Sequence, residues 1–571
     1  MSSKSLQRLF LAVALLCAFK TQAQAVKYKV PEGAPAPPIM YHGLVPGKSP
    51  MADVKKALGE PERATRWYNY KLYYPSEGRA GMYDIAHMTN DSPQATLASV
   101  EAASVPAGFE SDAAIREKLG APEYELRMVT WKLLDYSEQG VRFTLDAAGK
   151  TTGVAYVPHT YRRVPEGERD LVDLSQLREG PQPAPAKAAD LKGLQVGTAE
   201  RDITPQAADW LALPFTVHDP LKVRLAVFRN AELTVALVGA DVFGMGYMEV
   251  KAMRDSAKAL GVDQMIFGMA HNHASGDTSG FYGYYPEKYI AHIHDQVIDG
   301  ISDALAHLEP VGALKSANRE MPMDGSRVMG LFRNARNPAV LDPTISAIIV
   351  EGASGKTLAT LVHFACHVES IDKGGEIISA DFPGFMCDRI KADGGGQPIF
   401  LNGALGGMVS GDNAERTPES AQEMGITLAG IVKDLAAAVQ PGATFRFAAE
   451  ARALELPLTN PTFIALFKDS TRGLHRGRMV TDMTYIEIGE AQFISLPGEL
   501  LPEVSFEILE QMAGYPRMLV GLGNDQIGYM IPPYDFRDNY YEESVSVGPA
   551  TAVQVRDMAI RMLAAHQTDR N

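Results

Sequence analysis

The segment Met265–Asp277 reads MIFGMAHNHASGD and places two histidines, His271 and His273, directly after an apolar run. In an extended strand, residues i and i+2 point to the same face, so the two imidazoles can approach one ion. Imidazole is a common zinc ligand, and a catalytic zinc usually takes three protein ligands and a water. The pair alone is equally compatible with two unrelated loop histidines, so the surrounding sequence decides its meaning.

Residues 191–571 alternate between apolar runs and helical stretches. The apolar runs include LTVALVGA (Leu233–Ala240) and QPIFLNGA (Gln397–Ala404), and the helical stretches include YIAHIHDQVIDGISDALAHL (Tyr289–Leu308). Strands that alternate with helices predict an α/β domain in which helices flank a mixed sheet. Functional groups of such a domain lie on loops at strand ends, which fits the position of the histidine pair.

Residues 26–179 contain an internal repeat. VKKALGEPE (Val54–Glu62) recurs as IREKLGAPE (Ile115–Glu123), and YKLYYPSEG (Tyr70–Gly78) recurs as WKLLDYSEQG (Trp131–Gly140), both at an offset of 61 residues. A shared offset indicates duplication, with repeats at about 45–98 and 106–165. Each unit reads as a short helix followed by strands, so two small α+β repeats precede the α/β domain. They faintly resemble the helix-plus-sheet repeats of some envelope proteins. The repeats contain no cluster of His, Cys and carboxylates, so we expect them to form a binding or spacing module and not a catalytic one.

Two segments of the chain are expected to have no catalytic role. Residues 1–25 read as a signal peptide, with Lys4 and Arg8 before an apolar core and Ala23-Gln24-Ala25 as a cleavage site, so the protein is expected to be periplasmic or secreted. Residues 180–190, GPQPAPAKAAD, read as a Pro/Ala linker between the repeats and the domain at 191–571.

The bulk composition excludes some classes of partner. The chain carries 54 Lys and Arg against 69 Asp and Glu, a net charge of −15, and no basic run interrupts it. A nucleic-acid partner is therefore not expected. No stretch after the signal peptide is long and apolar enough to predict a transmembrane helix. Cys366 and Cys387 follow the expected cleavage site, and the sequence leaves open whether they pair or remain buried thiols.

Several short segments accompany the histidine pair in a fixed order. They are VGTAERDITP (Val196–Pro205), VHFACH (Val362–His367), ISADFPG (Ile378–Gly384), SLPGE (Ser495–Glu499), NDQIGY (Asn524–Tyr529) and YEES (Tyr541–Ser544). This set resembles the neutral/alkaline, non-lysosomal ceramidase family. The catalytic domain of that family has a VGxGRxDITGP-like strand, an HTHSGPG motif, a WFAVH-like strand, a PGE-like segment and a C-terminal NxYxxY…YEG stretch. The resemblance covers roughly residues 193–550.

The resemblance implies a zinc site. In the family, zinc is held by the first His of HxH, the His closing the WFAVH-like strand, the PGE-like Glu and a tyrosine. Residue by residue, these positions fall on His271, His367, Glu499 and Tyr529. Two histidines, a carboxylate and a phenolate make a sensible zinc shell with one position open for water. His363 matches a family residue that is not a ligand, which implies a structural role.

The resemblance also implies catalytic residues for metal-assisted amide hydrolysis. They are His273 as a proton-handling group, Tyr541, which follows Tyr529 by 12 residues as in the family motif, and Arg319 in an NR-like ANRE, with Arg327 and Arg333 as alternatives. In this scheme a zinc-activated water attacks the amide carbonyl, and His273 passes a proton to the leaving amine.

This chain departs from the family pattern in three places. The loop GALGGMVSGDN (Gly403–Asn413) places Gly407 where the family has Asp. HNHASGD stands in place of HTHSGPG. About 30 residues follow the YEES motif here, where the family continues into a β-sandwich, and the repeat module lies on the N-terminal side.

The sequence therefore predicts an exported zinc-dependent amidohydrolase that acts on ceramide or a related N-acylated lipid or amine. The departures leave two alternatives open: a metal hydrolase for another ester, amide or glycan, and a degenerate, non-catalytic envelope binding protein. The expected partner is a small-molecule or lipid substrate, with membrane contact at most peripheral. The oligomeric state stays open.

Overall fold

The computed structural model describes residues 38–567 apart from several short segments. The segments left out are residues 68, 77–81, 159–170, 176–187, 207–209, 212–213, 281–285, 330, 372–375, 413–414, 461–462, 464–473, 476–477 and 538–539. The signal peptide expected at 1–25 and residues 180–187 of the expected linker lie outside the described residues. Among the residues that are described, no helix has the length and apolar character needed to cross a membrane.

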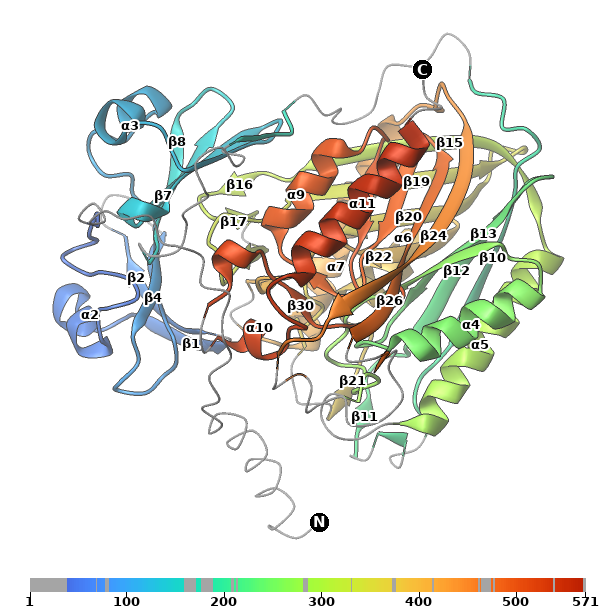
Figure 1. The fold of residues 1–571 in the computed structure, drawn as a ribbon, viewed down its shortest axis with the longest axis horizontal. Helices are drawn as coiled ribbons and strands as arrows, with labels where there is room; N and C mark the ends of the chain where they lie inside the picture. Colours follow the sequence, from blue (N-terminus) through green and yellow to red (C-terminus); the bar gives the residue numbers. More distant parts are fainter. Residues whose placement is uncertain are drawn as a thin grey trace.

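The N-terminal module is a nine-stranded sheet built from two copies of a helix followed by strands. Helix α2 (Met51–Leu58) opens the first copy and α3 (Asp112–Leu119) the second, 61 residues apart as the sequence repeat predicts. The strands are β1 (Arg63–Trp67), β2 (Asn69–Pro75), β3 (Tyr83–Met88), β4 (Leu97–Ala102), β5 (Tyr124–Arg127), β6 (Trp131–Tyr136), β7 (Val141–Asp146), β8 (Thr151–Tyr156) and β9 (Leu171–Asp173). Because β4 pairs with β8, the two copies form one sheet in the order β1-β2-β3-β4-β8-β7-β6-β5-β9 (Figure 1). The predicted pair of small α+β repeats is confirmed.

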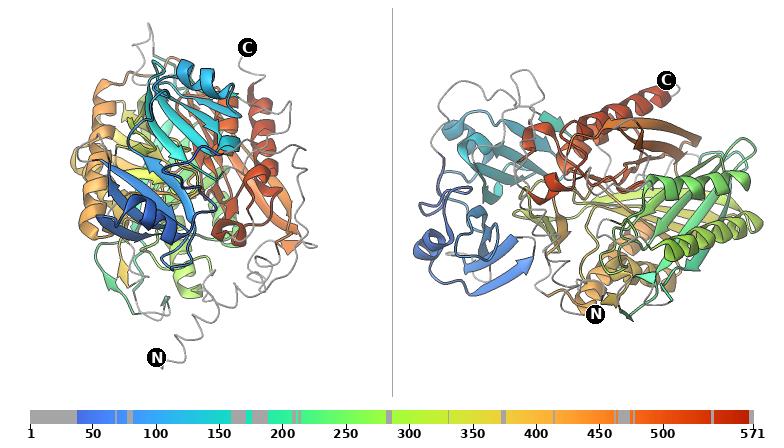
Figure 2. Two further views of the ribbon diagram at one scale, coloured as in Figure 1. Left: turned by 90° about the vertical axis from the view of Figure 1, so that its left-hand side faces the viewer. Right: turned by 60° about the horizontal axis from the view of Figure 1, so that its bottom comes forward.

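The two faces of the module sheet have different neighbours. On one face, Val54 of α2 and Ile115 of α3 pack against sheet residues such as Leu72 and Leu134. The opposite face is turned toward the rest of the chain, and Figure 2 shows the module, blue to cyan, against one side of the larger part. Leu126 and Leu133 on this face belong to the same hydrophobic cluster as residues of the larger part. The two parts therefore share a core.

The larger part is built around two main sheets with helices on their outer faces, and smaller sheets of two to four strands accompany them (Figure 1). The eight-stranded sheet has the order β14-β13-β12-β10-β15-β19-β20-β22. Its strands are β10 (Gln195–Asp202), β12 (Lys222–Arg229), β13 (Thr234–Ala240), β14 (Gln264–Met269), β15 (Glu309–Glu320), β19 (Thr344–Gly352), β20 (Thr357–Phe364) and β22 (Gln397–Asn402). The second sheet has the order β24-β26-β27-β29, with β25 paired to β26; these are β24 (Arg446–Pro457), β25 (Leu474–His475), β26 (Arg478–Gly489), β27 (Ala491–Ser495) and β29 (Arg517–Val520).

Alternating side chains of the strands fill the layers on either side. Along β13, Val238 packs with helices α4 (Tyr247–Ala259) and α5 (Glu287–Ala306), whereas Leu237 packs with the second sheet. This is the period-2 pattern of a strand with both faces buried. Helices α6 (Asp381–Ala392) and α7 (Pro418–Ala438) cover the other half of the large sheet, and α9 (Pro502–Gln511) and α11 (Thr551–Gln567) cover the second sheet. The predicted α/β class with mixed sheets and flanking helices is confirmed.

Three parallel strand pairs end at one edge of the two sheets. The pairs are β13 with β14, β20 with β22, and β27 with β29. Backbone hydrogen bonds join the loops that leave them: Met269 N–H donates to Leu522, Gly403 N–H to Phe364, and Gly521 N–H to Asn402. Parallel neighbours share the direction of their carboxyl ends, so the segments that follow these strands meet at one place.

Candidate metal centre

His271 follows β14 in a strained turn. The strand ends at Met269, and His271 has a φ of 61°, in the left-handed region that a non-glycine residue seldom adopts. The i, i+2 spacing suggested a regular strand at the histidine pair. The structure has a turn there instead. The two rings still lie together, with 4.9 Å between the centroids of His271 and His273. The His271 ring also stacks on Phe243 at 4.7 Å.

His367 approaches from the neighbouring parallel pair. It follows β20 by three residues, and its backbone N–H donates to the carbonyl of Val409 at 2.7 Å. The ring centroids of His271 and His367 are 5.0 Å apart. Both histidines are buried.

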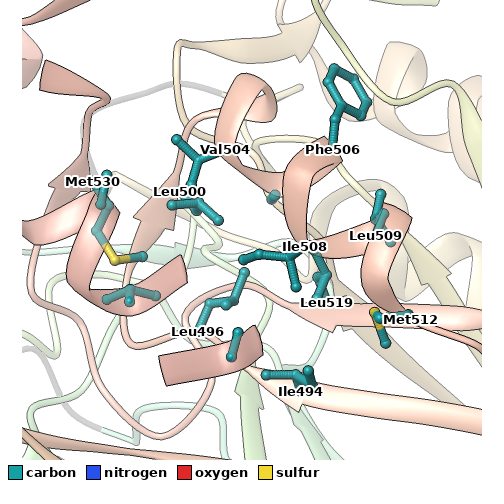
Figure 3. Packing of buried hydrophobic residues seen from close by; sticks show 14 of the residues in the cluster. Ile494, Leu496, Leu500, Val504, Phe506, Ile508, Leu509, Met512, Leu519 and Met530 are labelled. Carbon is teal, nitrogen blue, oxygen red and sulfur yellow. The ribbon is translucent and has the colours of Figure 1, made fainter. Parts of the chain in front are cut away.

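Glu499 and Tyr529 come from two short parallel strands, β28 (Glu499–Leu500) and β30 (Tyr529–Met530), and are directly opposite each other. The next residue of each strand, Leu500 and Met530, is buried in the core beside α9 (Figure 3). Successive strand residues face opposite sides, so anchoring Leu500 and Met530 in the core turns Glu499 and Tyr529 toward the histidines.

The side-chain distances bring these four residues to one point. Oε2 of Glu499 lies 3.1 Å from Nε2 of His367 and 3.6 Å from Nε2 of His271. The hydroxyl of Tyr529 lies 3.5 Å from the same Nε2 of His367. The amide of Gln526 donates to the other oxygen of Glu499 at 3.0 Å. The structure thus brings together His271, His367, Glu499 and Tyr529, the four residues that the family resemblance implies as ligands.

Hydrogen bonds to the backbone set the direction of the two imidazoles. Nδ1 of His271 lies 2.8 Å from the carbonyl oxygen of Phe243, and Nδ1 of His367 lies 3.2 Å from that of Val409. A carbonyl only accepts, so each Nδ1 carries the proton and each neutral ring directs its Nε2 lone pair at the cluster. This arrangement of outer hydrogen bonds is the one that metal-binding histidines have.

The charges at the cluster favour a cation. Burial raises the pKa of Glu499, but His271 and His367 outweigh it and bring that pKa down to about 2. Burial lowers the pKa of His271. For His367, burial also acts to lower the pKa, but the hydrogen bond to Glu499 and the charges of Glu369 and Glu499 together raise it above its usual value. Burial raises the pKa of Tyr529 well above its usual value, with Glu499 acting in the same direction. The Glu499 carboxylate faces the Nε2 lone pairs of the two histidines, so a proton on His367 or a bound cation is needed between them. A divalent ion would also favour the ionised, phenolate form of Tyr529.

His273 gives a second combination of donors. One nitrogen each from His271, His273 and His367 lie within 4.8 Å of one another. Nε2 of His273 is 3.9 Å from Oε2 of Glu369, and neither atom has a hydrogen-bond partner in the described part of the chain. Burial lowers the pKa of His273 to about 3, against the opposing effect of Glu369. Arg416 in turn lies 3.4 Å from the other oxygen of Glu369.

The remaining sequence-predicted residues have different positions. Tyr541, at the start of α10 (Tyr541–Ser544), is 49% exposed, and its ring centroid is 6.0 Å from that of Tyr529. Arg319 is not brought to the cluster: its guanidinium is 3.9 Å from Asp434 of α7, because its place in β15 turns it toward that helix. The alternatives Arg327 and Arg333 both pair with Asp412 instead.

His363 and the two cysteines are structural in this arrangement. Nε2 of His363 donates to the carbonyl of Leu519 at 3.0 Å, on β29 of the second sheet. Cys366 and Cys387 are free and buried.

The loop that departs from the family pattern lies directly behind the cluster. A side chain at Gly406 would place its Cβ 2.6 Å from the carbonyl oxygen of Glu499, and Gly407 has a φ of 75°. The next residue, Met408, accepts a hydrogen bond from the Tyr529 hydroxyl at 3.2 Å through its sulfur. The two glycines are therefore required by the close approach of this loop to β28 and by its turn.

Sequence reasoning did not find Phe243, Glu369, Arg416 or Gln526. Phe243 and Glu369 follow the ends of β13 and β20, so a search of every strand end for polar or aromatic residues could have found them. Gln526 lies in the NDQIGY segment, three residues before Tyr529. Nothing in the sequence around Arg416 indicates its contact with Glu369.

No protein-family model matches the sequence, and no curated protein matches it. Several solved structures match its fold, and two of them are ceramidases. Neutral ceramidase from Pseudomonas aeruginosa aligns with a TM-score of 0.56 at 16% identity, over 66% of this chain and 75% of that one. The chain carries a neutral ceramidase-like fold. A structure described as ceramidase complexed with C2 aligns with a TM-score of 0.55 at 16% identity, over 66% of this chain and 76% of that one. In this fold, His271, His273 and His367 form a cluster that could hold a metal ion.

Proposed function

We propose that this protein is a zinc-dependent amidohydrolase that cleaves the amide bond of ceramide or a related N-acylated lipid or amine. The observation that carries the proposal is the convergence of His271, His367, Glu499 and Tyr529 on one point at the sheet edge. The ceramidase-like fold supports the choice of substrate class.

The residues present fit a zinc ion. Their donor atoms are two imidazole nitrogens, a carboxylate oxygen and a phenol oxygen, all of which zinc accepts. The Nδ1 hydrogen bonds to Phe243 and Val409 fix both histidines with Nε2 available. When bound, zinc supplies an activated water at neutral pH and a Lewis acid for the carbonyl oxygen.

The chain itself supplies proton transfer and orientation. His273 is beside the ligands but turned toward Glu369, whose pKa Arg416 and His273 lower to about 2 against the effect of burial. A histidine that faces an ionised carboxylate can take a proton and later release it to a leaving amine. Tyr541 stands at the surface beside Tyr529, where its hydroxyl can meet a substrate oxygen.

One observation favours a different substrate as the second candidate. The Gly406–Met408 stretch lies against Glu499 and Tyr529, and it is here that the sequence departs from the family. A changed wall beside the ligands would alter the accepted amide, ester or glycan while keeping the metal chemistry.

The decisive experiment joins metal analysis to a substrate panel. The mature protein should contain about one zinc per chain and hydrolyse N-acyl sphingosines faster than N-acyl amino acids, simple esters or aryl glycosides. Zinc with turnover of another class would support the second candidate. An active protein without zinc would refute both, and zinc without turnover on any class would support a binding protein.

We also propose that the protein is exported to the periplasm or secreted. The support is the charged, apolar and small-residue pattern of residues 1–25. Fractionation of expressing cells, with N-terminal sequencing of the purified chain, tests this proposal. A chain that stays in the cytoplasm and retains Met1 would contradict export.

A further inference from the structure

Three polar side chains of the first repeat lie on the module face that meets the larger part. Lys71 is directly opposite His87 in the β2–β3 register, and Glu101 is two residues beyond the partner of His87 on β4. All three are buried. His87 Nε2 lies 2.6 Å from Oε1 of Glu101. This half of the face is charged, whereas the second repeat meets the larger part through apolar residues.

Arg333 of the larger part pairs with Glu101 of the module. Its guanidinium donates to Oε1 of Glu101 at 3.0 Å and lies 3.1 Å from Oδ1 of Asp412, with 1% of the side chain exposed. Ser326 donates to the other oxygen of Glu101, and Arg327 donates to Asp412 at 3.0 Å. Glu101 of the module is therefore joined to Asp412 through one buried arginine.

Arg333 lies on a ribbon of two paired strands, β18 (Phe332–Asn334) and β23 (Val409–Gly411), that contacts the candidate metal centre. In this ribbon, Arg333 is directly opposite Ser410. On its other side, Ser410 forms a bridge with His367. The carbonyl of Val409 accepts both the backbone N–H and Nδ1 of His367. One three-residue strand thus separates the Arg333 backbone from His367.

We propose that Glu101 of the N-terminal module is a positioning residue for the metal centre, acting through Arg333 and strand β23 on His367. This inference deepens the proposed function and rests on it. The buried pair fixes the β18–β23 ribbon, the ribbon places the Val409 carbonyl, and that carbonyl sets the direction of Nε2 in His367. The module is in this way part of the site, although none of its residues is a ligand.

The strength of the effect follows from the kind of contact. Strands of three residues have few ladder bonds, so buried ionic contacts have a large share in fixing their register. Changes to groups that orient a ligand typically weaken metal binding 10- to 100-fold. We therefore expect Glu101→Gln, which keeps the shape but removes the charge, to raise the zinc dissociation constant about 10-fold.

A matched control separates positioning from simple docking. Glu320 of β15 also joins the two parts, since it accepts from the backbone N–H of Val129 at 2.8 Å and of Thr130 at 2.9 Å. These two contacts lead to the turn between β5 and β6 and not to β23. Glu320→Gln should lower the unfolding temperature as Glu101→Gln does, but leave the zinc dissociation constant within about twofold, because no ligand hydrogen bond is touched.

The experiment measures five quantities in the full chain of the wild type and of each variant. They are the zinc dissociation constant by chelator competition, kcat and KM, the unfolding temperature, and the ¹⁵N resonances of His367 in metal-free protein. Glu101→Gln should weaken zinc binding, lower kcat by a larger factor than it changes KM, and shift the His367 resonances. Glu320→Gln should have none of these three effects. Arg333→Lys should weaken zinc binding to a similar extent. The double variant Glu101→Gln/Arg333→Lys should bind zinc no more weakly than either single variant.

Equal effects of Glu101→Gln and Glu320→Gln on zinc and on the His367 resonances would overturn the inference. So would additive effects of Glu101→Gln and Arg333→Lys. If the wild type binds no zinc, the proposed function fails, and the His367 resonances alone still decide whether Glu101 positions that ring.

Discussion

His367 and Glu499 are 132 residues apart in the sequence, yet Nε2 of one lies 3.1 Å from Oε2 of the other. His367 follows a strand of the large sheet, and Glu499 follows a strand of the second sheet. The contact therefore spans the line where the two sheets meet. A metal at this point would join them.

Replacing either of the two histidines proposed as ligands should remove both zinc binding and hydrolysis. In His271→Ala or His367→Ala, one of four zinc ligands is lost while the buried sheets remain. We expect no stoichiometric zinc, no measurable turnover and an unchanged circular dichroism spectrum. Zinc retained at wild-type level in either variant would contradict the assignment.

The two donor combinations make opposite predictions for His273 and Glu499. If the ligands are His271, His367, Glu499 and Tyr529, His273→Ala keeps its zinc and loses about 10²- to 10⁴-fold in kcat, as for a removed acid–base group. Glu499→Ala then loses zinc. The reverse pattern in elemental analysis would make His273 the ligand and give Glu499 a supporting role.

The two tyrosines can be separated by the same phenylalanine substitution. Tyr529→Phe removes a hydroxyl buried beside His367, so we expect about 10-fold or more weaker zinc binding. Tyr541→Phe removes a hydroxyl from an exposed residue, so zinc binding should be unchanged while kcat falls. Chelator competition and steady-state kinetics on both variants check this. Equal zinc affinity in the two would show that Tyr529 is not a ligand.

Lys71 should give the module interface a distinctive pH dependence. Burial, with Arg333 nearby, lowers the pKa of Lys71 to about 7 from 10.5. The unfolded chain then binds more protons than the folded chain between these values, so stability rises with pH from about 7 toward 10. The slope from this residue is at most about 1.4 kcal/mol per pH unit. Urea unfolding at pH 7, 8 and 9 should show this slope in the wild type and its loss in Lys71→Met; parallel curves would refute it.

The shared core bears on how independent residues 191–571 are. Every predicted ligand and catalytic residue lies in this range, so the sequence predicts that it suffices for chemistry. In the structure, Leu126 and Leu133 of the module share a cluster with Met479 and Leu509. A chain that starts at Leu191 should therefore keep its secondary structure but unfold at lower urea concentration and bind zinc more weakly. Stability and zinc affinity equal to those of the full chain would show that the module is dispensable.

Much of the candidate site could be predicted because its residues follow strands that are recognisable in sequence. MIFGMAHNH, TLVHFACH and FISLPGE each join an apolar run to a polar residue, and parallel strands bring such ends together. Arg319 was not placed correctly because its direction depends on the register of β15 against β19, which short motifs do not encode. Glu369 and Arg416 escaped notice because their meaning comes only from contact with each other and with His273.

The architecture was predictable in class and not in arrangement. Strands such as LTVALVGA are apolar on both faces, which indicates burial but does not say whether a helix or a second sheet covers each face. The 61-residue repeat predicted two similar units, and the structure adds that they join edge to edge in one sheet. Its charged half contacts β18 through residues that look like ordinary surface charges in the sequence.

Leu500 follows Glu499, and Met530 follows Tyr529, so each residue of the candidate site is next in the chain to a residue of the core. Because each core side chain shares a two-residue strand with a proposed metal ligand, a change in core volume should move the neighbouring donor atom. Substitutions that are harmless to folding elsewhere in this core would here be selected against through catalysis. Directed evolution of thermostability in this protein should therefore reach its limit first at these two positions, well before the rest of the interior is exhausted.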